Sequence, residues 1–173
     1  MNKTAKKILY IGISLIIIAL LLLIYFEWEE IYSKKESNDI MKTILNNKDN
    51  NKNEDEIVID DLKYIGYIVI PTLDLNLPIS KSPTLYYGSL MNNNMVICGH
   101  SYKSHFRYLY KLKQGDEVIF VDTKNNRYTY KVELVEELAS TDIKEMIESD
   151  FDLTLYTCTR DGLRRVTVRC NRV

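Results

Sequence analysis

The sequence predicts a mainly β domain, a closed or nearly closed barrel of about eight strands with short helices, preceded by one N-terminal transmembrane helix. An uncharged run of 19 residues near the N-terminus indicates the membrane helix. From residue 57 onward, apolar and polar residues alternate with a period of two, which is typical of strands with one buried face. Turn signals such as Gly115-Asp116 separate these segments.

The N-terminal segment, residues 1–28, is expected to be a basic cytoplasmic tip followed by a membrane anchor. Three lysines precede the uncharged run from Ile8 to Phe26, which as a helix would be about 28 Å long and would match the hydrocarbon layer of a bilayer. The residues that follow are "EWEE", whereas a cleaved signal peptide would have small residues there. The lysines place the N-terminus in the cytoplasm and the rest of the chain outside.

The charge and cysteine content exclude two classes of protein. Three of the 23 basic residues precede the anchor, which leaves 20 against 24 acidic residues and a net charge of −4 for the remainder. Such a surface has no basic footprint for nucleic acid. Three cysteines are too few for a disulfide framework, so at least one stays free or pairs between chains.

Residues 29–56 are predicted to be a polar stalk. They are rich in Asn, Lys, Asp and Glu and poor in large apolar side chains, so they cannot bury enough surface to offset the entropy lost on ordering. A short helix is plausible only near Ile40 to Leu45. The remaining residues, 57–173, are enough for one folded core and are predicted to form the β domain.

Within this domain, seven segments have the pattern of strands. They are "YIGYIVIP", "LDLNLPI", "MVICGH", "DEVIFVD", "RYTYKVELVEE", "DLTLYTC" and "RRVTVRC". Two short helices are expected, at Ser104 to Lys111 and Ile143 to Glu148. Asp142 stands three residues before Glu145, the spacing of a capping box.

Cys158 is the first candidate for chemistry. In the strand that ends with it, Leu153 and Leu155 would face the core, and Cys158 would lie on the opposite face. The connection "TRDGL" is short enough to make the next strand its antiparallel neighbour. There, Val166, Val168 and Cys170 would face inward and Arg165, Thr167 and Arg169 outward, so Arg165 is the better candidate to lie beside the thiol; Arg164 would start on the core side and reach outward.

His100 follows a hydrophobic strand and Gly99, whose freedom to turn would leave the imidazole at the rim of the barrel. A cysteine attacks a carbonyl as the thiolate, and a nearby imidazole can accept its proton or stabilise the anion. An arginine can donate to the oxyanion that develops on the carbonyl. His100, Cys158 and Arg165 therefore form a coherent set for acyl transfer. A buried structural thiol is the alternative for each cysteine, and it suits Cys98 and Cys170 better than Cys158.

Four segments in order resemble the sortases, the membrane-anchored cysteine transpeptidases of Gram-positive bacteria. "TLYTC" is similar to their Thr-Leu-x-Thr-Cys signature, and "VICGHSYKSHFRYLYKLKQGDEVIF" resembles the segment that carries their histidine. "RRVTVRC" resembles the strand that begins with their essential arginine, and "YIGYIVIPTLDLNLPI" resembles their first strand pair. The resemblance runs from about Tyr64 to the C-terminus.

The resemblance implies a role for each candidate. Cys158 corresponds to the nucleophile that forms a thioacyl intermediate with a C-terminal sorting signal of the Leu-Pro-x-Thr-Gly kind. His100 corresponds to the general acid and base, and Arg165 to the residue that orients the substrate carbonyl and stabilises the oxyanion. Arg164 remains the alternative for this arginine, and Thr157 is a weaker candidate for substrate positioning. The expected partners are surface proteins or pilins with such a signal and an amine acceptor, either a cell-wall precursor or a pilin lysine.

No cofactor or metal is expected, because Asp116, Glu117 and Asp122 lack the spacing of an EF-hand loop. The subclass stays open: residues 27–63 contain no proline, which disfavours a lid with an Asp-Pro-aromatic motif. Three other interpretations are weighed. A papain-like hydrolase would place its cysteine before its histidine, a non-catalytic peptide-binding barrel would not need all three residue types, and a zinc site of Cys98, His100 and Cys158 lacks paired-ligand spacing.

Overall fold

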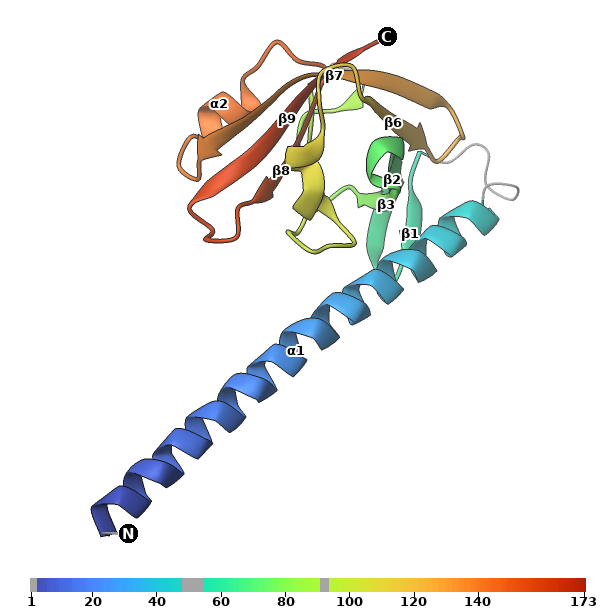
Figure 1. Ribbon diagram of the computed structural model, residues 1–173. Helices are drawn as coiled ribbons and strands as arrows, with labels where there is room; N and C mark the ends of the chain where they lie inside the picture. Colours follow the sequence, from blue (N-terminus) through green and yellow to red (C-terminus); the bar gives the residue numbers. More distant parts are fainter. Residues whose placement is uncertain (1–2, 48–54, 91–93) are drawn as a thin grey trace.

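One long helix leads into the β domain in the computed structural model, which describes residues 3–47, 55–90 and 94–173. This helix, α1, spans Lys3–Asn47 and extends away from the domain, with the N-terminus at its far end (Figure 1). Its apolar part is long enough to cross a membrane by length and composition, and the side chains from Ile8 to Phe26 are largely exposed. This part of the helix fits the expected membrane anchor.

The helix does not end where the apolar run ends, and here the expected stalk differs from the structure. Residues 29–47, predicted to be too polar to order, continue α1 without a break; the rest of the expected stalk up to residue 54 lies outside the described residues. This stretch contains no Gly or Pro, and its glutamates and lysines are good helix formers. Whether the chain divides functionally at residues 28 and 56 stays a prediction.

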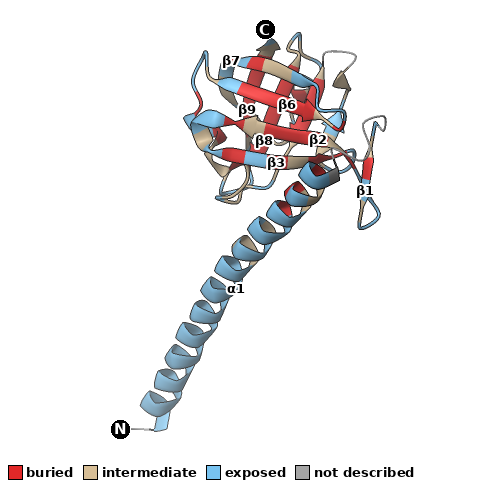
Figure 2. Ribbon diagram, turned by 90° about the vertical axis from the view of Figure 1, so that its right-hand side faces the viewer, coloured by how far each residue is buried: buried red, intermediate tan, exposed pale blue. Residues whose placement is uncertain are grey.

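Tertiary packing supplies the order that composition did not predict. Met41 and Ile44 are buried in a small cluster with Tyr64, Tyr67 and Val121 of the sheet. Met41 and Ile44 lie three residues apart, so they share one face of the helix. Figure 2 shows the helix exposed along its length and buried only where its last turns meet the domain. A segment too polar for a core of its own is ordered because the sheet already offers an apolar surface.

The domain consists of nine strands and short helices within the described residues. In chain order they are β1 (Ile57–Ile59), β2 (Leu62–Ile70), η1 (Pro71–Leu73), β3 (Leu75–Ser80), β4 (Leu85–Tyr87), β5 (Met95–Cys98), η3 (Phe106–Lys111), β6 (Glu117–Asp122), β7 (Arg127–Ala139), α2 (Ile143–Ile147), β8 (Leu153–Cys158) and β9 (Arg164–Arg172). All seven predicted strands are present, and β1 and β4, of three residues each, are additional. Both predicted helices are present, the first as a 3₁₀ helix, but the capping box is not: the Asp142 carboxylate makes no bond to α2 and accepts from the Ala139 N–H.

The strands form one curled sheet in the order β1-β2-β6-β7-β9-β8-β5-β4. β3 lies outside this order and pairs with β2 along the edge opposite to β6. All pairings are antiparallel except that of β5 with β8. Within the described residues no ladder joins β3 to β4, so the expected barrel is nearly closed rather than closed. The parallel pair matters for function, because it brings the carboxyl ends of β5 and β8 to the same edge.

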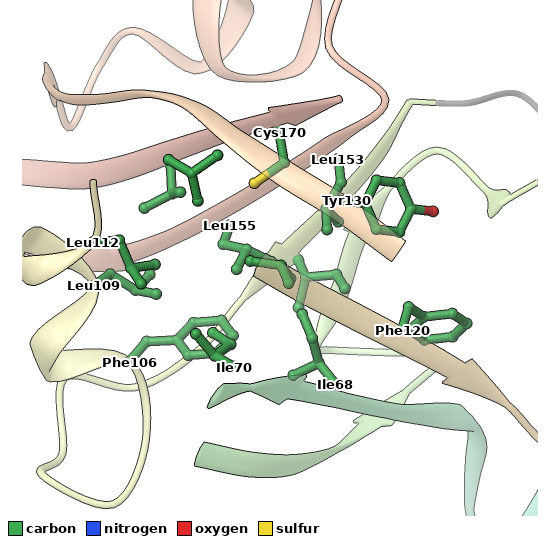
Figure 3. Packing of buried hydrophobic residues seen from close by; sticks show 14 of the residues in the cluster. Ile68, Ile70, Phe106, Leu109, Leu112, Phe120, Tyr130, Leu153, Leu155 and Cys170 are labelled. Atoms are coloured by element: carbon green, nitrogen blue, oxygen red, sulfur yellow. The ribbon is translucent and has the colours of Figure 1, made fainter. Parts of the chain in front are cut away.

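The concave side of the sheet holds the main core, which fixes the facing of β8 and β9. Leu153 and Leu155 pack there with Val166, Val168 and Cys170, so the alternation predicted for both strands is confirmed. Figure 3 shows the residues of β8 and β9 beside Ile68 and Ile70 of β2, with Phe106, Leu109 and Leu112 from the η3 region closing the side of the cluster. The opposite face of β8 and β9 is also buried at Thr154, Tyr156, Thr167 and Arg169. Its end, at Cys158 and Arg165, is accessible to a substrate.

Candidate active site

Cys158 and Arg165 are direct partners across the β8–β9 ladder. They form its last pair before the connecting turn, and the thiol of Cys158 is exposed. The turn is fixed by bonds from the N–H of Gly162 to the Thr159 carbonyl and from the N–H of Thr159 to the Arg164 carbonyl, each 3.0 Å long. Gly162 has a φ of +74°, a conformation that glycine adopts at no steric cost.

The two neighbouring arginines have different surroundings. Nη1 of Arg165 donates to the carbonyls of Gly162 and Arg164, both at 3.1 Å, which leaves its Nε and Nη2 without a partner among the described residues. Arg164 instead pairs with Glu137, with Nε 3.2 Å from the carboxylate and Nη2 3.1 Å from the backbone carbonyl. Arg165 lines the same cleft as the thiol and Arg164 does not.

His100 reaches this edge of the sheet through the parallel pairing of β5 with β8. Cys98 is opposite Tyr156, and the Gly99 N–H continues the ladder by donating to the Tyr156 carbonyl at 3.1 Å. Two residues further along each strand stand His100 and Cys158, so the ladder brings them together at its end. The imidazole is exposed at the rim and lines the cleft with Cys158.

Gly99 precedes the histidine for a packing reason. Its backbone is not in the left-handed region, but a Cβ there would stand 2.6 Å from a ring carbon of Phe106. Phe106 is 1% exposed and has no room to withdraw. The expectation that Gly99 serves a sharp turn is therefore replaced by close contact between the strand end and η3.

Thr157 ties the cysteine strand to the histidine turn. Its side chain is 2% exposed, and its hydroxyl donates to the carbonyl of Gly99 at 2.8 Å. Thr157 borders the cleft, yet its one donor is already used inside the protein. The structure thus shows a contact between strands, and the suggested contact with substrate stays a prediction.

The cleft that contains these residues has a volume of about 680 Å³. Its barrel side includes His100, Thr157, Cys158 and Arg165. Its other wall comes from α1, which the sequence analysis did not predict. The helix contributes Glu29, Tyr32, Ser33, Glu36, Ser37 and Ile40.

Other titratable groups around the cleft were also missed by sequence reasoning. His105 lies with its Nε2 3.5 Å from Oγ of Ser33 on α1, and burial, together with the nearby His100, lowers its pKa to about 4. Tyr102 donates to the Glu29 carboxylate at 2.6 Å, and this bond is the main reason why its pKa is raised to about 12. The spacing of Ser37, Met41 and Ile44 was the one signal in the sequence that this helix has a docked face.

Cys98 and Cys170 are structural thiols in this arrangement. Cys170 is fully buried in the main core, and burial raises its pKa to about 12. The Cys98 thiol donates to the Pro83 carbonyl at 3.2 Å, and burial raises its pKa as well. No group of three or more His, Cys, Asp and Glu side chains suited to a metal ion occurs in the described part of the chain.

Comparison with known proteins decides the family. A family model for the sortase domain matches residues 57–173. The chain belongs to the sortase family. The resemblance found in the four sequence segments is thereby confirmed, and so is the expected fold.

Individual relatives agree with this assignment. Sortase A of Bacillus anthracis is 30% identical over 128 residues, which are 64% of this chain and 60% of that protein. The structure of sortase A from Corynebacterium diphtheriae is similar with a TM-score of 0.51 and 26% identity, covering 64% of this chain and 60% of that one. The structure of sortase C from Clostridium perfringens has a TM-score of 0.50 and 27% identity, covering 80% and 90%. A structure of Clostridium perfringens sortase C with the C-terminal cell wall sorting motif is 24% identical to this chain and matches it with a TM-score of 0.51, covering 80% of this chain and 90% of that one. The present chain spans about 60% of the length of the B. anthracis relative.

Proposed function

We propose that this sortase is a cysteine transpeptidase that cleaves a Leu-Pro-x-Thr-Gly-like C-terminal sorting signal and transfers the new carboxyl end to an amine. The observation that carries this proposal is the pairing of Cys158 with Arg165 at the open end of the β8–β9 ladder, with His100 in the same cleft. Family membership supports the reaction class. The sorting motif solved with the C. perfringens enzyme supports the class of substrate.

The first half-reaction follows from the chemistry of these three side chains. The Cys158 thiolate attacks the carbonyl of the scissile bond, and the carbonyl oxygen becomes an oxyanion. The free Nε and Nη2 donors of Arg165 are available for that oxyanion, which is where a fixed charged donor accelerates acyl transfer most. When the intermediate collapses, the C–N bond breaks, His100 gives a proton to the departing amine, and a thioester to Cys158 remains.

The second half-reaction reverses these roles. The lone pair of an incoming neutral amine attacks the thioester carbonyl, and His100 takes a proton from the nitrogen as the new C–N bond forms. A second oxyanion forms beside Arg165, the C–S bond breaks, and the thiolate of Cys158 is regenerated as the new amide leaves. We propose a cell-wall precursor or a pilin lysine as the source of the amine. The apolar segment of α1 would anchor the enzyme in one pass, with the N-terminus cytoplasmic and the cleft outside.

Mass spectrometry of the full-length protein in detergent tests the proposal. The protein is incubated with a small library of Leu-Pro-x-Thr-Gly-like peptides and an amine acceptor, with Cys158→Ala as the control. A thioacyl adduct on Cys158 and an acceptor-dependent product are expected. A folded protein that forms no adduct with any peptide would contradict the proposal and favour the peptide-binding alternative.

The two arginines provide a sharper test of the roles. Arg165→Ala is expected to lower kcat/KM by about a hundredfold or more, the usual loss for a missing oxyanion donor. Arg164→Ala removes an exposed ion pair with Glu137, so it is expected to change stability by at most about 1 kcal/mol and leave turnover nearly intact. The reverse ranking in a peptide transfer assay would refute the assignment of Arg165.

A further inference from the structure

The loop that carries His100 is docked onto the anchor helix. This loop, residues 100–105, joins β5 to η3, and its contacts with α1 involve two neighbouring glutamates. The Tyr102 hydroxyl donates to Glu29 at 2.6 Å, and the Lys103 backbone N–H donates to Glu30 at 2.6 Å. Glu30 also lies within ion-pair distance of the side chains of Lys103 and Arg107, at 3.6 and 3.9 Å.

The imidazole of His100 makes few contacts of its own within the described residues. It is exposed, and its ring nitrogens have no hydrogen-bond partner among the described residues. Its ring contact is with Tyr102, at 5.3 Å between centroids and an interplanar angle of 31°. An exposed side chain held by one aromatic neighbour takes its orientation from that neighbour.

We propose that the membrane-anchor helix positions the catalytic histidine: Glu29 of α1 fixes the Tyr102 hydroxyl, and the Tyr102 ring fixes the imidazole of His100. Glu29 and Tyr102 are then positioning residues for the reaction. This inference rests on the proposed function, because it assumes that His100 is the acid and base. It makes the helix a working part of the active site in addition to a tether.

Two features of the contact suit this role. The pKa of Tyr102 is raised to about 12 by its bond to Glu29, so the hydroxyl remains a donor across the physiological range. A hydrogen bond to a charged acceptor is stronger than one between neutral groups. Glu30 fixes the backbone of the same loop at Lys103, so Tyr102 is held from its side chain and from the adjacent peptide.

The position of Glu29 on the helix links the site to the membrane. Glu29 comes three residues after Phe26, the end of the apolar run, which is about 5 Å further along a helix. The helix is continuous between them, without a glycine or proline that would allow a hinge. The loop of His100 is thus held close to the membrane surface.

The test uses the full-length chain in detergent micelles with four single variants and the double variant of Glu29→Ala with Tyr102→Phe. Glu29→Ala and Tyr102→Phe each remove the hydrogen bond, and Tyr102→Phe keeps the ring. Glu29→Gln keeps an oxygen that accepts from the hydroxyl and serves as the rescue variant. Asp39→Ala is the matched control, because Asp39 is an exposed carboxylate of the same helix whose one ion-pair partner within the described residues is Lys42, one turn away.

Two readouts are compared. Peptide transfer gives kcat and KM, and the rate of iodoacetamide alkylation at Cys158, followed by peptide mass spectrometry across pH, reports how the imidazole supports the thiolate without any substrate. Glu29→Ala and Tyr102→Phe are expected to lower kcat on the order of tenfold with KM nearly unchanged and to shift the pH profile of alkylation. The double variant should be no worse than either single one, and Glu29→Gln should recover most of the rate.

Each outcome decides the inference. Wild-type kcat and alkylation in both Glu29→Ala and Tyr102→Phe would overturn it, as would an equal loss in Asp39→Ala. A double variant whose losses multiply would show that the two residues act separately and would overturn the linked role. If the wild type transfers no peptide at all, the proposed function fails, and the alkylation profiles still decide whether the helix positions His100.

Discussion

Replacing Thr157 by valine separates two roles that this residue could have. Valine has nearly the same shape and the same branched β carbon, so the substitution leaves no cavity, but it removes the hydroxyl that donates to the Gly99 carbonyl at 2.8 Å. The side chain is 2% exposed, so the lost bond is not simply replaced by one to water. The carbonyl that loses its partner belongs to the residue just before His100.

The magnitude follows from this geometry. A hydrogen bond of this kind contributes about 1 kcal/mol net, and leaving a buried carbonyl without a donor costs about 1–3 kcal/mol. Because the carbonyl lies near the cleft, water can reach it in part, and we expect Thr157→Val to lower the free energy of unfolding by about 1–2 kcal/mol. For a chain of this size, each kcal/mol corresponds to about 2–4 °C in Tm.

Thermal unfolding and peptide transfer by the full-length protein measure the two consequences. If Thr157 positions the β5 end, Thr157→Val lowers both Tm and kcat and leaves KM nearly unchanged. Thr157→Ser is the control: it loses a buried methyl, worth about 1 kcal/mol, but keeps the donor and therefore kcat. A valine variant with wild-type Tm and a raised KM would refute this reasoning and show that the hydroxyl contacts substrate.

Two further predictions concern Gly99 and His105, which lie on either side of the His100 turn. Gly99→Ala would place a Cβ 2.6 Å from the Phe106 ring, so we expect a loss of about 1–3 kcal/mol in unfolding free energy and a displaced His100; a wild-type Tm in a denaturation scan would contradict the packing argument. His105 has its pKa lowered to about 4 by burial and by His100, against a small opposing effect of Glu30. The His105 ring is neutral in the folded protein at pH 7. Its contribution to the free energy of unfolding is therefore fully present above the unfolded pKa of about 6.5 and is lost as pH falls toward 4. Converted in full to unfolding free energy, the lowered pKa of His105 corresponds to about 3 kcal/mol. Because the ring is partly exposed to solvent, we expect about 1–2 kcal/mol. Unfolding measured between pH 7 and pH 4 should show this loss in the wild type and a smaller one in His105→Gln, and equal slopes would speak against it.

Much of the candidate site was predictable from the sequence because strands obey a strict alternation. Once "LTLYTC" and "RRVTVRC" were assigned as neighbouring antiparallel strands, parity placed Arg165 rather than Arg164 on the face of Cys158. The register of β8 with β9 agrees with that assignment. The position of His100 near Cys158 was harder to predict from the sequence, since no local pattern indicates that β5 pairs in parallel with β8.

The docked part of α1 shows where such reasoning stops. Composition measures whether a segment can form a core of its own, and residues 29–47 cannot. It does not measure whether a surface elsewhere in the chain will accept a few side chains, as the sheet accepts Met41 and Ile44. The contacts of Glu29 with Tyr102 and of Ser33 with His105 each join residues more than 70 positions apart, and no local pattern encodes them.

Local sequence patterns were enough to predict the apolar anchor, the strands, the facing of their side chains and the three residue types needed for acyl transfer, because hydrophobic periodicity and motif order are local properties of the chain. Three other features come from packing between distant segments: in the described residues the sheet stays open between β3 and β4, Gly99 lies against Phe106, and the anchor helix forms a wall of the cleft. These features depend on which distant surfaces meet, and that choice is made by packing over the whole chain.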